Sequence, residues 1–152
     1  PYTNWIDTLS EIDLEKINTA IDQTEIGHLK SNRFYELSDG QLQRVLIARA
    51  LAQDTEVIIL DEPTAHLDMH QTINIFSLLQ KLVQQTNKTI IISSHEINLA
   101  LQLSDEIILL TENSVQFGTT EELISQNAFD RLFPDNLLKF NKSLQQFVIN
   151  KG

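Results

Sequence analysis

Three short, unbroken apolar runs constrain the fold of this chain more than any other feature: Val57–Leu60, Thr89–Ile92 and Ile107–Leu110. A strand with one solvated face alternates apolar and polar residues, whereas a strand buried on both faces, as in a parallel sheet, is apolar throughout. Segments with the spacing of amphipathic helices separate these runs. The alternation predicts an α/β domain with a mainly parallel sheet.

Helix-start signals place helices around these strands. A capping box of Ser10 and Asp13 predicts a helix over Ile12–Gln23, and a nearly all-apolar helix follows over Gln41–Ala52. Apolar residues in helical register predict another over Thr72–Gln85. The remaining expectations are a helix capped by Ser93 with Glu96, a strand at Val115–Phe117 closed by Gly118, a helix capped by Thr119 with Glu122, and a weak helix after Pro134.

Composition narrows the function classes. The 152 residues include 11 basic and 21 acidic ones, and the net charge of -10 argues against non-specific binding to nucleic acid or anionic lipid. The absence of cysteine excludes disulfides and thiolate metal sites. No apolar run reaches transmembrane length, and Pro1–Trp5 has neither the basic nor the apolar region of a signal peptide. We expect a soluble, single-domain protein whose membrane link would come through a partner.

Three motifs occupy positions suited to nucleotide chemistry. Leu37–Gln41 precedes a buried helix, whose free N–H groups and dipole favour phosphate, although a plain helix cap at Ser38 explains an isolated motif of this kind more simply. Val57–Asp68 ends a buried strand in two carboxylates, at the sheet edge where α/β proteins bind ligands. There an Asp suits Mg²⁺ and a neighbouring Glu can deprotonate water. Ser94–Glu96, which contains His95, follows the next buried strand at the same edge.

In order and spacing these motifs resemble the signature motif, the Walker B motif with its D-loop, and the switch histidine of the ATP-binding cassette (ABC) family. The resemblance covers essentially the whole chain. It implies the C-terminal part of a P-loop NTPase (RecA-like) core over residues 54–152, and part of the helical subdomain with the signature motif over residues 1–53. It also implies ATP and Mg²⁺ as cofactors.

The resemblance gives the Walker B and switch residues specific roles. Asp61 would position Mg²⁺, and Glu62 would be the general base that activates water. His95 would contact the γ-phosphate, and Asp68 would be the D-loop aspartate that communicates across a dimer of cassettes.

The signature residues Ser38, Gly40 and Gln41 would lie at the γ-phosphate bound by the opposing cassette. Asp39 stands among them, where the family usually has glycine. A first-turn Asp suits a helix start, but its charge would repel an incoming γ-phosphate.

The chain has no phosphate-binding loop of the form Gly-x-x-x-x-Gly-Lys-Ser/Thr, because none of its four glycines is followed by lysine. We therefore expect a truncated cassette that begins inside the helical subdomain and is inactive alone. A central strand of the family's sheet would also be missing. Unpaired strand edges then predict an oligomer, or a sheet closed up in an order foreign to the family.

Two other features have simpler explanations. His66 and His70 are four residues apart and could share a metal, but Leu67 stands where zinc proteases have Glu, and His66 falls in the D-loop. Tyr2 and Trp5 could form a partner-binding patch, although packing on the helical subdomain explains them more simply.

Two functions remain open. The Tyr2–Trp5 start and the Asp61–Asp68 segment resemble the branch of the family that drives import of iron chelates, haem and cobalamin. This branch implies a second cassette in a homodimer and transmembrane permease subunits as partners. It also implies a cytoplasmic position on the inner face of the membrane, held only through the permease, and no nucleic acid. The alternative is a soluble ABC-type ATPase acting on ribosomes or DNA, which the acidity and the lack of tandem cassettes disfavour.

Overall fold

The computed structural model of the chain describes residues 9–111, 113–133 and 138–150. Tyr2 and Trp5, the candidate partner-binding patch, lie outside the described residues. The chain divides into two compact units, residues 1–94 and 95–152, and each is described by itself. The subdomain boundary expected between residues 53 and 54 falls inside the first unit and stays a prediction. None of the helices in the described ranges is long and apolar enough to cross a membrane.

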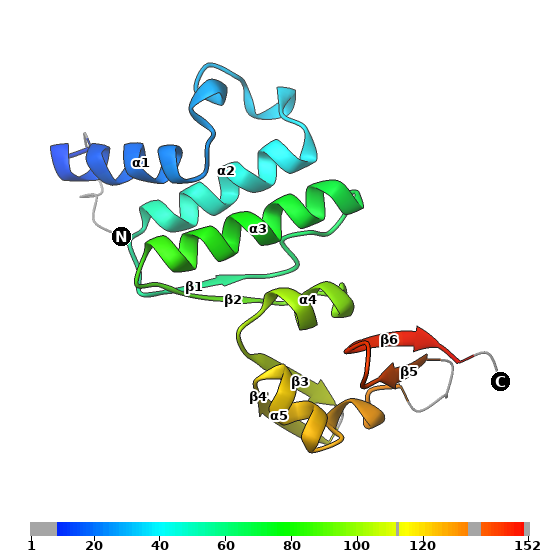
Figure 1. Cartoon of the computed structure of the whole chain (residues 1–152). Helices are drawn as coiled ribbons and strands as arrows, with labels where there is room; N and C mark the ends of the chain where they lie inside the picture. The colour runs from blue at the N-terminus through cyan, green and yellow to red at the C-terminus, as the bar shows by residue number, and fades with distance from the viewer. Residues whose placement is uncertain (1–8, 112, 134–137, 151–152) are drawn as a thin grey trace. The chain divides into compact units, whose positions relative to one another are not determined.

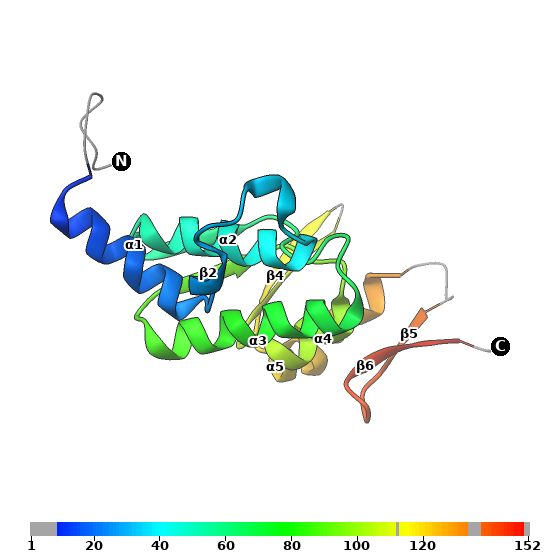
Figure 2. The same cartoon turned by 90° about the horizontal axis from the view of Figure 1, so that it is seen from above.

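The first unit places helices on one side of a two-stranded sheet (Figure 1). Its strands pair in parallel, with Val57 opposite Thr89 and Leu60 opposite Ile92. Helix α2 packs against both α1 and α3, and Figure 2 shows the same three helices from above. The elements are α1 (Glu11–Gln23), the short 3₁₀ turns η1 (Gly27–Leu29) and η2 (Phe34–Glu36), α2 (Asp39–Ala52), β1 (Val57–Leu60), α3 (Met69–Gln85) and β2 (Thr89–Ile92).

Side-chain caps begin the three helices of this unit. The capping box of Ser10 and Asp13 opens α1, and Ser38 with Gln41 forms a second capping box for α2. Asp68 accepts a hydrogen bond from the backbone N–H of Gln71 and so opens α3. Because these caps satisfy N–H groups that the helix leaves free, α2 and α3 each begin two or three residues earlier than apolar periodicity predicted.

An aliphatic cluster forms the core between these helices and one face of the sheet. The other face is exposed, since Val57, Ile59 and Ile91 all point into solvent and Ile59 is 73% exposed. The expectation that these strands are buried on both faces is therefore wrong for the described residues, because the helices of this unit cover only one face. The buried members of the cluster are Ala20, Ile26, Leu29, Ile47, Ala48, Leu51, Ile58, Ile75, Leu78, Leu79 and Leu82.

The second unit consists of two antiparallel hairpins with short helices. Strand β3 pairs with β4, so that Ile107 lies opposite Gly118, and β5 pairs with β6, so that Phe140 lies opposite Phe147. A capping box of Thr119 and Glu122 begins α5, as the sequence predicted. The elements are α4 (Ile97–Leu103), β3 (Ile107–Thr111), β4 (Ser114–Gly118), α5 (Thr120–Ser125), η3 (Ala128–Arg131), β5 (Leu138–Asn141) and β6 (Gln146–Ile149).

Phenylalanine rings dominate the core of the second unit. The rings of Phe129 and Phe140 stack with centroids 4.6 Å apart, and Phe147 meets both of them edge-on, at 6.0 and 5.2 Å. Such ring pairs contribute about 0.5–1.5 kcal/mol beyond their buried area. Leu101, Leu109 and Leu123 join the cluster from α4, β3 and α5, and Ala128 is its remaining buried member.

One expectation about the second half of the chain is corrected here. The tail after Pro134 is not a weak helix, because residues 138–149 form the β5–β6 hairpin. Large apolar residues are spaced two apart in each strand, at Leu138 and Phe140 and at Phe147 and Ile149. This spacing suits a strand with one buried face. In the described part of the chain β2 pairs with β1 and β3 pairs with β4, and these pairs lie in separate units, so a closed-up sheet stays a prediction. Oligomerisation stays a prediction.

Candidate functional site

The carboxyl ends of β1 and β2 bring a serine to the two predicted catalytic carboxylates. Asp61 and Glu62 follow β1, and Ser93 follows β2, directly after the paired residues Leu60 and Ile92. The hydroxyl of Ser93 donates to Asp61 Oδ1 at 2.6 Å and accepts from the backbone N–H of Glu62 at 2.8 Å. The backbone N–H of Ser93 donates to the Leu60 carbonyl at 3.1 Å. One residue thus fixes both the side chain of Asp61 and the backbone of Glu62.

This arrangement corrects the role expected for Ser93. It was predicted to cap the helix that follows, together with Glu96. Instead α4 begins at Ile97, its N-cap is Glu96, and no side chain caps it. The signal was available in the sequence, because a hydroxyl directly after one parallel strand lies beside the residue that ends its neighbour.

A tight turn carries the chain from Glu62 to α3. Glu62 and His66 both adopt left-handed backbone conformations, with φ of 44° and 67°. Such φ values are uncommon and unfavourable outside glycine, and they cluster at functional sites. The N–H of Ala65 donates to the Glu62 carbonyl at 3.1 Å, while Pro63 and Thr64 are buried beneath the turn. The turn therefore leaves Asp61 and Glu62 exposed at the sheet edge on a fixed backbone.

The D-loop ends in Asp68, whose Oδ1 accepts from the Gln71 N–H at 2.8 Å as the N-cap of α3. His66 lies in the turn before this helix, as predicted. His70 lies within the first turn of the helix, where its Nδ1 is 3.2 Å from the side-chain amide of Asn74. No group of three or more His, Asp or Glu side chains in residues 9–111, 113–133 and 138–150 could hold a metal ion.

The signature segment lies at the start of α2. The Ser38 hydroxyl accepts from the Gln41 N–H at 3.4 Å, and Gln41 Oε1 accepts from the Ser38 N–H at 3.0 Å. Asp39 is the first residue of the helix and is exposed. A side chain at Gly40 would place its Cβ 3.1 Å from Gln71 Oε1, so glycine allows α2 to approach the first turn of α3.

The structure thus brings the signature segment close to the first turn of α3, the helix that Asp68 caps. An open hollow of about 360 Å³ lies between them, and its lining includes Ser38, Gly40, Gln41 and Gln71. His95 is exposed and begins the second unit, just before α4. Its proximity to Glu62 stays a prediction.

The described residues suit a Mg²⁺ ion whose remaining ligands come from a bound nucleotide. Asp61 offers one exposed carboxylate, already oriented by Ser93. Mg²⁺ in proteins is commonly held by one or two carboxylates together with phosphates and water. Asp61 is therefore suited to be one ligand of a nucleotide-bound ion and not the centre of a separate protein cage.

A parallel strand pair whose first strand ends in two carboxylates, in one unit with a capped helix start that can meet phosphate, is typical of a nucleotide-binding α/β core. The family described as ABC transporter matches residues 3–65. The achromobactin transport ATP-binding protein of Dickeya dadantii is 40% identical over 135 residues, which are 88% of this chain and 50% of that protein. An ABC transporter ATP-binding protein of Methanocaldococcus jannaschii is 36% identical over 153 residues, covering 100% of this chain and 53% of that protein.

Solved structures agree with these relatives. An inward-facing structure of an ABC transporter assigned to the metal-chelate type superimposes with a TM-score of 0.79 at 30% identity. The match covers 97% of this chain and 59% of that one. The chain belongs to the ATP-binding cassette family. It spans about half the length of the curated relatives it matches.

Proposed function

We propose that this chain supplies the signature and Walker B parts of the ATP-hydrolysing subunit of an ABC importer. The observation that carries the proposal is the Asp61–Ser93–Glu62 junction, in which one hydroxyl orients the Asp61 carboxylate and holds the Glu62 backbone. A carboxylate pair on a fixed backbone at the carboxyl edge of parallel strands suits phosphoryl transfer, where positioning provides most of the catalysis.

In this proposal each carboxylate has a separate task. Asp61 would help hold Mg²⁺, which supplies charge neutralisation at the phosphates when it is bound. Glu62 would orient the attacking water and take its proton as general base. The left-handed turn at Glu62 supports this role, because it projects an exposed carboxylate beyond the strand end. His95 would contact the γ-phosphate.

The signature segment would act on nucleotide bound by a second cassette. The start of α2 presents backbone N–H groups and the positive end of the helix dipole, which favour an anion. Ser38, Gly40 and Gln41 would contact the γ-phosphate there, with Asp39 beside them, and Asp68 would communicate across the same interface. We propose a homodimer of cassettes, docked from the cytoplasmic side on transmembrane permease subunits, as the working assembly.

The proposed cargo is a metal chelate such as a ferric siderophore, haem or cobalamin. The achromobactin transport protein and the metal-chelate type transporter support this class. Its test is iron uptake from achromobactin by Dickeya cells whose own ATP-binding subunit is replaced by a hybrid. In that hybrid, this chain would follow the N-terminal half of the Dickeya subunit. Failure of uptake by a hybrid that hydrolyses ATP would count against this branch. A soluble ABC-type ATPase acting on ribosomes or DNA would then be the better explanation.

The hydrolysis proposal is tested with the same hybrid as a purified protein. Glu62→Gln keeps the shape of the side chain but cannot accept a proton, so we expect ATP turnover to fall by about 10²–10⁴-fold. Glu56→Gln is the matched control, because Glu56 is also an exposed glutamate and precedes the other end of β1. Turnover of the Glu62→Gln hybrid within about threefold of the unaltered hybrid would refute Glu62 as the base.

The 152-residue chain alone offers only half of a composite nucleotide site. Without a glycine-rich loop and lysine it has no cradle for the β- and γ-phosphates. We expect calorimetric titration with Mg-ATP to detect no binding at micromolar concentrations. Tight binding would reveal a phosphate site other than the one proposed.

A further inference from the structure

Helices α1 and α2 end in the same unusual way. After the C-cap residues Thr24 and Gln53, the next residues are Glu25 and Asp54, with left-handed φ of 61° and 55°. Glycine or asparagine is favoured at this position because other residues meet a steric penalty there. A carboxylate also lies unfavourably at the negative end of a helix dipole. Because both Glu25 and Asp54 have this unfavourable backbone conformation and this unfavourable charge, we expect each of them to make a compensating interaction.

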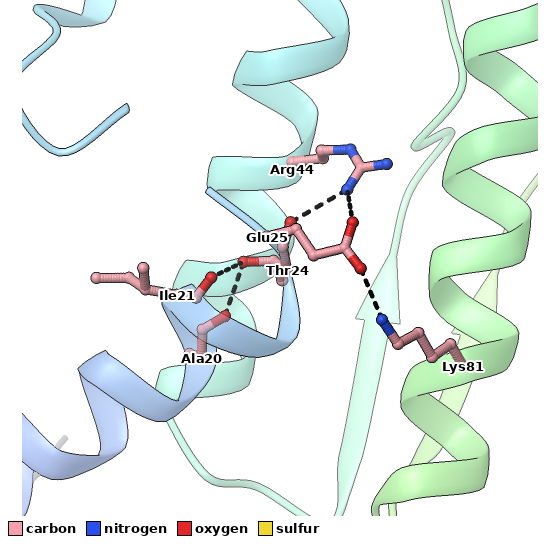
Figure 3. Close-up of polar contacts among 6 residues, drawn as sticks. All are labelled: Ala20, Ile21, Thr24, Glu25, Arg44 and Lys81. Carbon is pink, nitrogen blue, oxygen red and sulfur yellow. Dashed lines mark hydrogen bonds and ion pairs between the residues drawn. The ribbon is translucent and has the colours of Figure 1, made fainter. Parts of the chain in front are cut away.

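Glu25 makes ion pairs with basic residues of two neighbouring helices. Its Oε1 lies 2.6 Å from Lys81 Nζ of α3, and its Oε2 lies 3.6 Å from Arg44 Nη1 of α2. The same Arg44 nitrogen donates to the Thr24 carbonyl at 3.1 Å, which caps the end of α1 (Figure 3). Thr24 is fully buried, and its hydroxyl donates to the Ala20 carbonyl at 2.7 Å. Glu25 therefore joins α1, α2 and α3 at one point.

Asp54 makes the reciprocal contact at the other end of α2. Its Oδ2 lies 3.2 Å from Lys16 Nζ of α1, and its Oδ1 lies 2.8 Å from Lys88 Nζ, between α3 and β2. Lys88 also donates to the Thr55 carbonyl at 2.9 Å. Each helix of the α1–α2 pair thus ends in an acid that meets a cation of the other helix and a lysine from α3 or the segment after it.

The two contacts differ in their distance along α2 from the signature segment. Arg44 follows Ser38 by six residues, less than two helical turns, whereas Asp54 follows it by sixteen. We propose that Glu25 is a positioning residue for the signature segment: by joining Arg44 and Lys81 it fixes the first half of α2 against α3, whose N-terminus carries Asp68. The contribution to activity rests on the proposed function, while the fixing of α2 does not.

Amide hydrogen exchange of the 152-residue chain tests the structural half of this proposal without nucleotide. Exposed ion pairs are individually weak, so the expected effect is modest. With Glu25→Gln, we expect amides in the first half of α2 to exchange about fivefold faster. Asp54→Asn is the matched control, because it removes an equivalent acid and should leave these amides within about twofold of the unaltered chain.

A double variant separates a specific contact from a general loss of stability. If Glu25 acts through Lys81, the Glu25→Gln/Lys81→Met chain should exchange no faster in α2 than Glu25→Gln alone. Additive effects of the two substitutions would overturn the proposal. The proposal would also be overturned if Glu25→Gln and Asp54→Asn raised amide exchange in the first half of α2 equally.

The hybrid cassette tests the link to activity. A looser signature segment weakens the engagement of ATP across the dimer, so Glu25→Gln should raise the KM for ATP about fivefold and leave kcat within about twofold. Asp54→Asn should leave both parameters within about twofold. Equal KM values for the two variants would overturn the positioning role. An unaltered hybrid without ATPase activity would instead refute the proposed function, and hydrogen exchange would still decide whether Glu25 fixes α2.

Discussion

Residues 9–94 and residues 95–150 build their cores from different side chains. The cluster in the first unit consists of leucine, isoleucine and alanine, supplied mostly by three long helices and one sheet face, with Ile26 and Leu29 from the segment after α1. The cluster in the second unit centres on Phe129, Phe140 and Phe147, which come from a 3₁₀ turn and a hairpin. The first unit also contains Asp61 and Glu62 with the turn that follows them, the D-loop residue Asp68, and the signature segment. Regular helices packed on parallel strands therefore support the site, while the aromatic cluster organises short, irregular segments.

The largest expected effect sharpens this comparison by testing whether the two cores are independent. Phe129→Ala removes the ring that both hairpin phenylalanines contact, and should destabilise the second unit by about 3–5 kcal/mol. Leu82→Ala removes a fully buried side chain of the first unit and should cost about 2–5 kcal/mol there. Hydrogen exchange should show the loss of protection confined to the unit that carries each substitution. Loss of protection throughout the chain in both variants would show a single cooperative core.

The same comparison explains what the sequence could predict. In the first unit α1 has a capping box, α2 is apolar nearly all round and α3 has apolar residues in helical register, so all three helices were located to within three residues. The parallel pairing of β1 and β2, with Asp61 and Glu62 at its carboxyl end, followed from unbroken apolar runs. Such patterns are local, and a packed helix or strand preserves them.

The rest depended on contacts between distant residues or on weak local signals. Phe129, Phe140 and Phe147 have no regular spacing, and the hairpin turn is set by Asn141, whose side chain accepts from the N–H groups of Ser143 and Leu144 at 3.0 Å. An Asn that closes its own turn is a weaker signal than glycine or proline. Ser93 was missed at the site for a similar reason. Its partners Asp61 and Glu62 are more than thirty residues away, so a local capping pattern gave a plausible but wrong role.

Substitution of Ser93 should have an intermediate effect. It tests whether Asp61 and Glu62 depend on the residue that follows β2. Ser93→Ala removes the hydrogen bonds to Asp61 and to the Glu62 N–H, although water can replace part of them at this exposed position. We expect a loss of about 1 kcal/mol in the stability of the first unit and a fall in turnover of the hybrid of about tenfold. Urea unfolding and ATPase assays measure these, with Ser77→Ala, an exposed serine of α3, as control. Turnover equal to that of the control would show that Asp61 and Glu62 need no support from β2.

The smallest expected effect concerns the acids that join the helices of the first unit. The hydrogen bond from Lys81, aided by the nearby Arg44, lowers the pKa of Glu25 below its ordinary value of 4.5. Lys88 first, and then Lys16, lower the pKa of Asp54 below 3.8. A carboxyl whose pKa is lower in the folded state stabilises the fold above its unfolded pKa, and this contribution is lost as the pH falls through the folded value. Stability should therefore decline below about pH 4.5 for Glu25 and below about pH 3.8 for Asp54.

Solvent screening limits the size of this acid effect. Both side chains are about half exposed, so we expect each acid to contribute only a few tenths of a kcal/mol up to about 1 kcal/mol, and less at high salt. Glu25→Gln/Asp54→Asn should lower the unfolding free energy of the first unit at pH 6, and the difference from the unaltered chain should shrink toward pH 3 because protonation removes the same charges. Urea unfolding at both pH values, in low and high salt, measures this. A difference that stays the same at pH 3 and pH 6 would mean that the two acids act through packing and not through charge.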